Sequence, residues 1–297
     1  MSRLTFMLSL LLALGVLGCD GAGDSPDDDD TSVADDDDDD DDDADCGDAE
    51  PVGLLDDAGL LPYPSMHMMI DDPETPTGRR LAFEDDSLPV ADGGSPMDMD
   101  RLNRLDGFSV ANTSVVLLPD ADIDKGCLPS IHDLGSSLDP GSSVQIIDLE
   151  SGDRIPCFAE LDAHPDCTGP ENRTLLIRPM KAMAFATHHA VVLTSALVDH
   201  DGNTVTTPER FAALRDGGDV HPGLCERIDD YEALFERLET LEIPRSDLVL
   251  AWDFYTGSEE TVHAPLDTIV AAGLEALPAD PTFEPDYEVD WVEDTDE

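Results

Sequence analysis

The stretch from 174 to 203 constrains the fold of this chain most. It holds two short apolar runs, Thr174 to Arg178 and His189 to Val198, which are rich in leucine and β-branched residues. Runs of this length, bounded by turn residues, are typical of buried strands. The second run leads into Asp201-Gly202-Asn203, whose residues tolerate the positive φ of a tight turn. The stretch therefore predicts two buried β-strands and a reversal of the chain.

Further strand candidates follow the same pattern, with turn residues such as Asp139-Pro140-Gly141 between them. These candidates cover residues 113 to 118, 143 to 149, 154 to 161 and 248 to 256. Short strands that alternate with turns are typical of sandwich folds. We therefore expect a mainly β domain over residues 51–257, an Ig-like β-sandwich.

Helices are expected late in the chain. Thr207-Pro208-Glu209 predicts a capped helix start with proline at the first helical position, and Gly217 is placed to end this helix. Apolar residues from 231 to 241 recur at helical spacing, which predicts an amphipathic helix packed on a sheet. The sandwich would thus carry a helical insertion at about 207–243. Another helix should start after Ser258 and run to about Leu277.

The N-terminus has the features of an export signal. Arg3 precedes an apolar run that is too short to span a bilayer comfortably and that ends in Val16-Leu17-Gly18-Cys19. These four residues resemble the lipobox of bacterial lipoproteins, in which the cysteine is lipidated after cleavage. The resemblance implies a signal peptide over 1–19 and a protein anchored through Cys19 to a bacterial membrane, at the outer membrane or cell surface. An ordinary signal peptide is the alternative.

Residues 20–50 are strongly acidic. They contain eighteen Asp and Glu and no Lys or Arg, with an unbroken run from Asp35 to Asp43. Such a segment buries too little apolar surface to offset the entropy of ordering, and its charges repel one another. It is predicted to be a disordered linker. Poly-aspartate could also collect divalent cations, but selective binding needs a fixed geometry.

Residues 51–297 carry 51 acidic and 14 basic residues. A surface dominated by carboxylates repels nucleic acid and anionic lipid headgroups. We therefore expect no nucleic-acid partner, and membrane contact only through the lipid anchor. No cofactor is indicated by the sequence.

The cysteines allow one disulfide prediction. Without Cys19 five remain, and Cys157 and Cys167 are close enough in sequence to close a small loop in an exported protein. The odd count leaves at least one thiol over, and Cys46 in the linker is the expected one. Zinc is the competing interpretation, but no CxxC or HxxxH spacing accompanies these residues.

A weak calcium site is one interpretation of Asp120, Asp122 and Asp124, which are spaced like the start of a calcium-binding loop. The glycine of such a loop comes one place late, at Gly126, and Ile131 occupies the closing position. His200 also lies among carboxylates, but there a hairpin turn is the stronger interpretation.

The remaining candidate groups are expected to be structural. Arg79 and Arg80 are an adjacent pair of cations in an acidic domain, so they should pair with neighbouring carboxylates rather than bind an anion. His188 and His189 stand at the start of a strand, without a recognisable nucleophile beside them.

Six short motifs occur in an order that resembles one family across residues 50 to 277. They are Leu61-Pro62-Tyr63-Pro64, Pro76-Thr77-Gly78-Arg79-Arg80, Leu105-Asp106-Gly107-Phe108-Ser109, Leu176-Ile177-Arg178-Pro179, Leu193-Thr194-Ser195-Ala196-Leu197 and Leu248-Val249-Leu250-Ala251-Trp252. The chain resembles the N-terminal domain of bacterial virulence-factor-type lipase lipoproteins. In that family a β-rich domain, similar to bacterial Ig-like domains, precedes an α/β-hydrolase domain that holds a serine nucleophile. The resemblance implies esterase or lipase activity for a complete protein.

Two departures from that family are visible. Where the family has a Pro-Gly turn this chain has Phe185-Ala186, and losing glycine from a position with positive φ would cost about 1 kcal/mol. A Gly-x-Ser-x-Gly nucleophile elbow is also missing from the sequence. The nearest pattern, Gly107 to Ala111, ends in alanine and coincides with a scaffold motif. We therefore expect no catalytic residue in this chain.

Residues 258–297 are interpreted as a helix and an acidic tail, the truncated start of a further domain. Tyr287, Val289 and Trp291 alternate with acidic residues like another half-buried strand, and family members continue from here towards the hydrolase domain. A complete short protein is an equal alternative. Two functions follow: the non-catalytic β-domain of a lipase-like lipoprotein, or a stand-alone surface lipoprotein whose Ig-like module binds a protein or glycan.

Overall fold

The computed structural model describes residues 49–55, 61–84, 98–118, 121–163 and 173–276. The chain divides into two compact units, Met1–Asp43 and Ala44–Glu297, and every described residue belongs to the second. The predictions for the signal peptide, Cys19 and the acidic linker up to residue 48 therefore lie outside the described residues. So do those for Asp120, Cys167 and the tail from 277 onwards.

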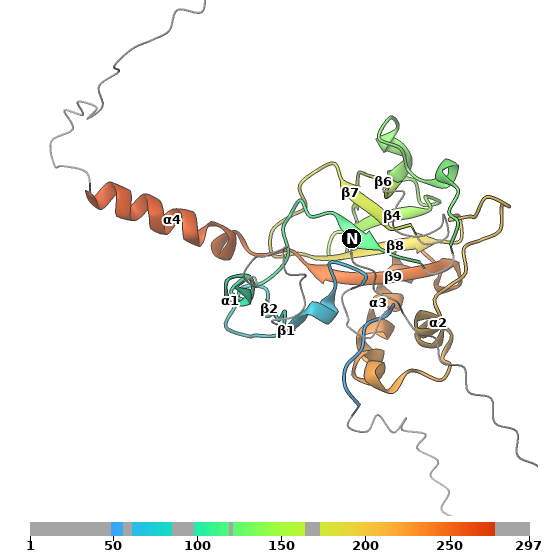
Figure 1. The fold of residues 1–297 in the computed structure, drawn as a ribbon, viewed down its shortest axis with the longest axis horizontal. Helices are drawn as coiled ribbons and strands as arrows, with labels where there is room; N and C mark the ends of the chain where they lie inside the picture. Colours follow the sequence, from blue (N-terminus) through green and yellow to red (C-terminus); the bar gives the residue numbers. More distant parts are fainter. Residues whose placement is uncertain (1–48, 56–60, 85–97, 119–120, 164–172, 277–297) are drawn as a thin grey trace, which may run out of the picture. The chain divides into compact units, whose positions relative to one another are not determined.

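The described strands form three antiparallel sheets (Figure 1). A hairpin pairs β1 (Met69–Asp71) with β2 (Arg79–Leu81). The three-stranded sheet has the order β3 (Ser114–Val116), β7 (Leu175–Pro179), β6 (Cys157–Leu161). The four-stranded sheet has the order β5 (Arg154–Ile155), β4 (Val144–Asp148), β8 (His188–Thr194), β9 (Leu248–Tyr255).

Helices make up a comparable part of the described chain. The α-helices are α1 (Met99–Leu102), α2 (Glu209–Asp216), α3 (Ile228–Thr240) and α4 (Glu259–Ala276). The 3-10 helices are η1 (Met66–Met68), η2 (Lys125–Cys127), η3 (Leu134–Leu138), η5 (Pro222–Arg227) and η6 (Arg245–Asp247). The fold is therefore mixed, with antiparallel sheets and helices, rather than mainly β. None of the described helices is both long and apolar enough to cross a bilayer.

The register of β8 and β9 sorts their side chains onto two faces. His188 lies opposite Tyr255, and His189 lies opposite Phe254. Because successive side chains of a strand point to opposite faces, His188 and Tyr255 share one face and His189 and Phe254 the other. On the second face the ring of Phe254 meets that of Phe108 at a centroid distance of 6.2 Å. The face that carries His188 is covered by α3.

Helix α3 is held on the sheet by its apolar stripe. Tyr231, Leu234, Phe235 and Leu238 are all buried, at the spacing of three and four residues that places side chains on one face of a helix. Arg245 adds a cross-link, because its guanidinium lies 4.3 Å from the centre of the Phe235 ring and also pairs with the Glu232 carboxylate. The amphipathic helix predicted for 231–241 is thus confirmed.

Most predicted strands are found near their expected bounds, with two corrections. Residues 154–161 do not form one strand, because β5 and β6 belong to different sheets with Pro156 between them. Proline has no N–H to donate to a ladder, so a continuous strand there would lose a hydrogen bond. The strand expected over 189–198 is also shorter, since β8 ends at Thr194 after a shift in its register with β9.

Of the predicted turns and helix ends, two are confirmed and one is wrong. The reversal after β8 is confirmed, because Asp199 N donates to Asn203 O at 2.9 Å and Gly202 has a φ of 83°. Gly217 ends α2 with a φ of 71°, as expected. The predicted cap by Thr207 is wrong: Pro208 is the N-cap residue, and the Thr207 hydroxyl accepts a hydrogen bond from Arg215 Nη1 at 3.1 Å.

Candidate functional site

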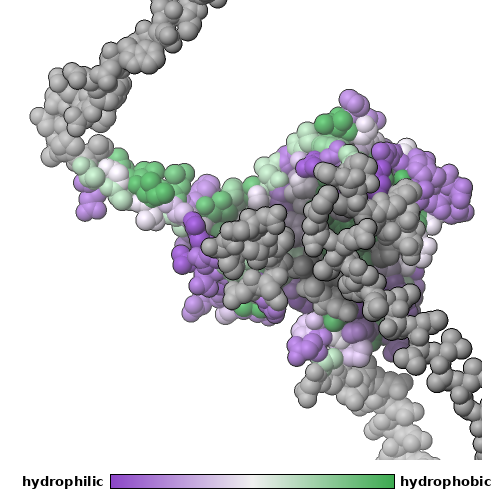
Figure 2. Space-filling model, in the orientation of Figure 1, coloured by the Kyte–Doolittle hydropathy of each residue, from purple (hydrophilic) through white to green (hydrophobic). Residues whose placement is uncertain are grey.

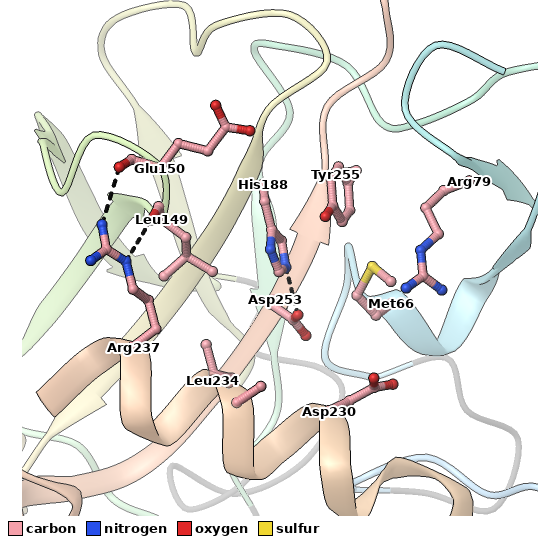
Figure 3. A pocket seen from close by; sticks show the side chains of 11 residues that line it. Met66, Arg79, Leu149, Glu150, His188, Asp230, Leu234, Arg237, Asp253 and Tyr255 are labelled. Carbon is pink, nitrogen blue, oxygen red and sulfur yellow. Dashed lines mark hydrogen bonds and ion pairs between the residues drawn. The ribbon is translucent and has the colours of Figure 1, made fainter. Parts of the chain in front are cut away.

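A cavity of about 290 Å³ lies where α3 faces the ends of β8 and β9 (Figure 3). The sheet contributes His188, Asp253 and Tyr255 to its lining. The helix contributes one face, from Asp230 to Arg237. The remaining lining residues come from η1, from β2 and from the turn between β4 and β5. Segments far apart in the sequence therefore meet at this site.

The wall formed by the sheet is an imidazole, a carboxylate and a phenol. His188 Nε2 lies 2.7 Å from Asp253 Oδ2, and the His188 ring stacks on the Tyr255 ring at a centroid distance of 4.3 Å. The strand register explains both contacts, since Tyr255 is directly opposite His188 and Asp253 lies two residues back on the same face. Burial raises the pKa of Tyr255, opposed by the charge of Arg79 and helped by nearby carboxylates, so its hydroxyl remains protonated.

The wall formed by the helix is fastened to the turn between β4 and β5. Arg237 Nε donates to Leu149 O at 2.7 Å, and its Nη2 donates to Glu150 O at 3.1 Å (Figure 3). Asp230, one end of the same helix face, is paired with Arg227 at 3.2 Å. Two of the charged side chains in this wall therefore already have partners within the protein.

The third wall comes from the N-terminal part of the domain. Met66 lies at the start of η1, and Arg79 lies on β2. The Arg79 side chain forms an ion pair with Asp71. Arg80 pairs with Asp72 at 2.5 Å, so the predicted pairing of both arginines with neighbouring carboxylates is confirmed. Arg79 also lines the cavity, which the sequence did not indicate.

A buried histidine lies beside the cavity. His67 Nε2 is 3.3 Å from the Tyr231 hydroxyl, and a smaller hollow that both residues line also contains Asp253. Burial, helped by the charge of Arg227 and opposed by that of Asp253, lowers the pKa of His67 to about 4. His67 is therefore neutral at physiological pH.

The lining residues of the cavity supply only part of a nucleophilic active site. His188 and Asp253 could act as a base and its orienting carboxylate, but the residues that line the cavity include no serine, threonine or cysteine to serve as a nucleophile. Ser109, the serine of the pattern nearest to a nucleophile elbow, uses its Oγ to accept a hydrogen bond from Ala111 N at 3.3 Å. It is not a lining residue of this cavity.

A second feature is the junction between β9 and α4. Ser258 Oγ caps the first turn of α4 by accepting a hydrogen bond from Thr261 N at 3.2 Å. Asp106 Oδ1 holds this turn in place, because it accepts from Ser258 N at 2.9 Å and from the Thr261 hydroxyl. The adjacent Gly107 packs directly on the chain, because a Cβ there would lie 2.5 Å from Gly257 N. The Leu105 to Ser109 motif therefore fixes the start of α4.

Helix α4 itself has no buried residue. Its five large apolar side chains are all exposed, and Figure 2 shows hydrophobic side chains along it. Their exposed fractions are Val262 39%, Leu266 61%, Ile269 69%, Val270 49% and Leu274 64%. Monomeric soluble proteins rarely expose contiguous apolar surface of this kind. We call this surface the α4 apolar stripe.

The predicted calcium ligands are only partly within the described residues. Asp122 and Asp124 lie 3.6 Å and 3.9 Å from the two ring nitrogens of His200, and Asp124 Oδ1 accepts from Gly126 N at 2.8 Å. Asp120 lies outside the described residues. Among the residues that the structure does describe, no group of three or more His, Cys, Asp or Glu is arranged to hold a metal ion. The weak calcium site stays a prediction.

The disulfide also stays a prediction, since only one of its cysteines is described. Cys157 is a fully buried thiol at the start of β6, and its N–H donates to Ser137 Oγ at 3.0 Å. Burial raises the pKa of this thiol to about 11, which makes it a poor nucleophile in the reduced state. Cys167 lies outside the described residues.

Sequence reasoning placed both histidines at the start of a strand, and this position is confirmed. His189 is a core residue whose Nδ1 lies 3.0 Å from Thr187 O. The place of His188 beside Asp253 was missed, because the two residues are 65 positions apart. One signal was available: both are polar residues within otherwise apolar strands.

A scan against protein-family models found no match for the chain, and a search of curated proteins found no match either.

Proposed function

We propose that the chain is the non-catalytic N-terminal β-domain of a lipid-anchored, lipase- or esterase-like protein of the bacterial cell envelope. The observation that carries this proposal is the α4 apolar stripe, which follows the last strand of the domain directly. In the family that the motifs resemble, a hydrolase domain comes after the β-domain. A hydrolase domain packed on α4 would remove this stripe from water.

The arrangement of the strands supports an Ig-like sandwich for this domain. Two antiparallel sheets of three and four strands are present, and the rings of Phe254 and Phe108 meet between β9 and the segment before β3. Tyr63, whose ring meets that of Phe108 at 5.5 Å, is hydrogen-bonded to Val115 of β3. A chain of aromatic contacts thus connects the two sheets, as the core of a sandwich requires.

Burial of the α4 apolar stripe would stabilise the packing of a covering domain on this helix. Fully burying one large aliphatic side chain contributes roughly 1.5–3 kcal/mol. The stripe carries five such side chains, all exposed along one helix. Asp106 and Gly107 hold the first turn of this helix against the β-domain, so the orientation of a domain attached through α4 would be defined rather than free.

The anchor is proposed on the residues around Cys19. The lipobox-like Val16-Leu17-Gly18-Cys19 and the acidic segment after it would place the β-domain at a distance from the membrane. Acyl chains contribute about 0.8 kcal/mol for each methylene buried, so a triacylated cysteine holds a protein firmly on a bilayer. The net negative charge of the domain would keep it from lying on anionic headgroups.

Labelling with palmitate in a bacterial host tests the anchor. The wild-type chain should incorporate the label and sediment with membranes, whereas Cys19→Ser should lose both properties. Cys46→Ser removes a cysteine from the same acidic segment and is the matched control, which should behave as the wild type. Label and membrane association that persist in Cys19→Ser would contradict the anchor.

An apolar dye tests the stripe. The purified chain should enhance the fluorescence of anilinonaphthalene sulfonate, and the double variant Leu266→Ser with Ile269→Ser should reduce that enhancement. Thr268→Ser changes a neighbouring position of the same helix without removing apolar surface and should have no effect. Equal fluorescence from the wild type and the double variant would show that α4 offers no apolar surface to a covering domain.

A second candidate function is a stand-alone surface lipoprotein with an Ig-like binding or adhesion module. The cavity beside α3 favours it, because a hollow of about 290 Å³ with converging polar groups is the usual form of a small-ligand site. Under this function the same anchor presents a ligand site at the cell surface.

A further inference from the structure

We propose that the cavity between α3, the ends of β8 and β9, and β2 binds a neutral polyhydroxylated ligand, namely one sugar ring of a glycan. This inference names the ligand for the second candidate function and rests on it. It does not depend on a hydrolase domain.

Most charged side chains that line the cavity already have a partner within the protein, although the Glu150 carboxylate forms no salt bridge with a described residue. Asp253 is paired with His188, and Arg79 is paired with Asp71. Asp230 is paired with Arg227, and Arg237 donates to the carbonyl oxygens of Leu149 and Glu150. A charged ligand that binds at the paired groups would have to break one of these pairs, and a charge that is removed from water without a partner is costly.

A neutral ligand can still use the hydrogen-bonding capacity that these pairs leave. His188 occupies only Oδ2 of Asp253, so Oδ1 remains available as an acceptor. Arg79 forms its ion pair with Asp71 through Nη1, and a guanidinium carries five N–H donors. Tyr255 and the Glu150 carboxylate at the rim add a hydroxyl and a further acceptor. These donors and acceptors are matched by a ligand whose groups both donate and accept hydrogen bonds. The vicinal hydroxyl groups of a sugar have this property.

The size and apolar lining agree with one ring. A volume of about 290 Å³ lies at the lower end of the range for ligand pockets, too small for a longer oligosaccharide to be enclosed. Met66, Leu149 and Leu234 supply apolar surface against which the C–H faces of a sugar ring can pack. The remaining units of a glycan would extend out of the mouth of the cavity into solvent.

Ligand-observed saturation-transfer NMR on the full chain tests the proposal. The probes are the methyl glycosides of neutral hexoses, with N-acetylneuraminic acid as an anionic sugar and glucosamine as a cationic one. At least one neutral glycoside should show saturation transfer, and its affinity should exceed that of both charged sugars. No transfer to any neutral glycoside, or tighter binding of either charged sugar, would overturn the assignment.

Two variants locate the binding. Asp253→Asn should weaken binding of the neutral glycoside at least tenfold, because it disturbs both the pair with His188 and the available acceptor. Ala233→Phe fills the cavity from an exposed position on α3, so it should abolish binding even if Asp253→Asn proves unstable. Glu160→Gln changes an exposed ion pair on β6, away from the cavity lining, and is the control that should bind normally.

Binding that survives Ala233→Phe would place the ligand elsewhere and refute the proposal. These results are independent of palmitate labelling and of dye binding to α4. A failure of the glycan proposal can therefore be told apart from a failure of the anchor or of the hydrolase-domain proposal.

Discussion

Replacing Ala186 with glycine should stabilise this protein. Ala186 lies in the turn before β8 and has a φ of 49°, in the left-handed region that side chains other than glycine rarely adopt. Among the described residues only one other non-glycine residue, Glu242, has a positive φ. A glycine at this position could adopt the same φ without the strain that a Cβ brings.

The magnitude follows from two opposing effects. The left-handed conformation destabilises an alanine by roughly 1–2 kcal/mol, whereas glycine adopts it without this strain. Glycine also gives the unfolded chain more conformational freedom, which lowers the free energy of unfolding by about 0.4–1 kcal/mol. The hydrogen bond from Ala186 N to Gly257 O at 3.0 Å uses only backbone atoms and should survive. At the middle of these two ranges, Ala186→Gly raises the free energy of unfolding by about 0.8 kcal/mol.

Urea unfolding and thermal melting measure this gain. For a domain of this size the melting temperature should rise by about 1–4 °C. The matched control is Ala184→Gly, two positions earlier and, unlike Ala186, without a positive φ, which should lower the free energy of unfolding by about 0.4–1 kcal/mol. If both variants destabilise the protein equally, Ala186 carries no strain and the reasoning fails.

Two further predictions concern the α4 junction and the buried histidine. Gly107→Ala should destabilise the protein by about 1–3 kcal/mol in urea unfolding, because its Cβ would come within 2.5 Å of Gly257 N and force the two segments apart; unchanged stability would show that this contact yields. His67 has a pKa of about 4 in the folded chain against about 6.5 unfolded, so its contribution is fully present above pH 6.5 and is lost as the pH falls towards 4. Between pH 7 and pH 5 the wild type should therefore lose about 2 kcal/mol more than His67→Asn, and equal losses would contradict a buried neutral imidazole.

Local patterns predicted the parts of this fold that local chemistry decides. The strand runs, the turn at Gly202 and the end of α2 at Gly217 all depend on residues within a few positions of one another. Arg79 and Arg80 also found carboxylates nearby in sequence. The split at Pro156 was readable in principle, since proline cannot donate within a ladder. These features were accessible because their causes lie within one segment.

The cavity was not accessible in this way. Met66, Arg79, Asp230 and Asp253 come together only when α3 docks on the sheet and when β8 and β9 adopt their register. A one-residue slip of that register would move His188 to the opposite face, and nothing in the local sequence fixes it. The function of α4 is equally hidden, because its apolar residues predict a buried helix while the described residues leave its side chains exposed.

The coding sequence that follows the codon for Glu297 tests the central claim most directly. A lipase-like protein whose β-domain presents α4 to a hydrolase domain requires an open frame that continues into a Gly-x-Ser-x-Gly elbow, followed by an acidic residue and a histidine. We expect that frame, and we expect its full-length product to hydrolyse carboxylic esters. A stop codon directly after Glu297 would contradict the claim and leave a non-enzymatic surface module.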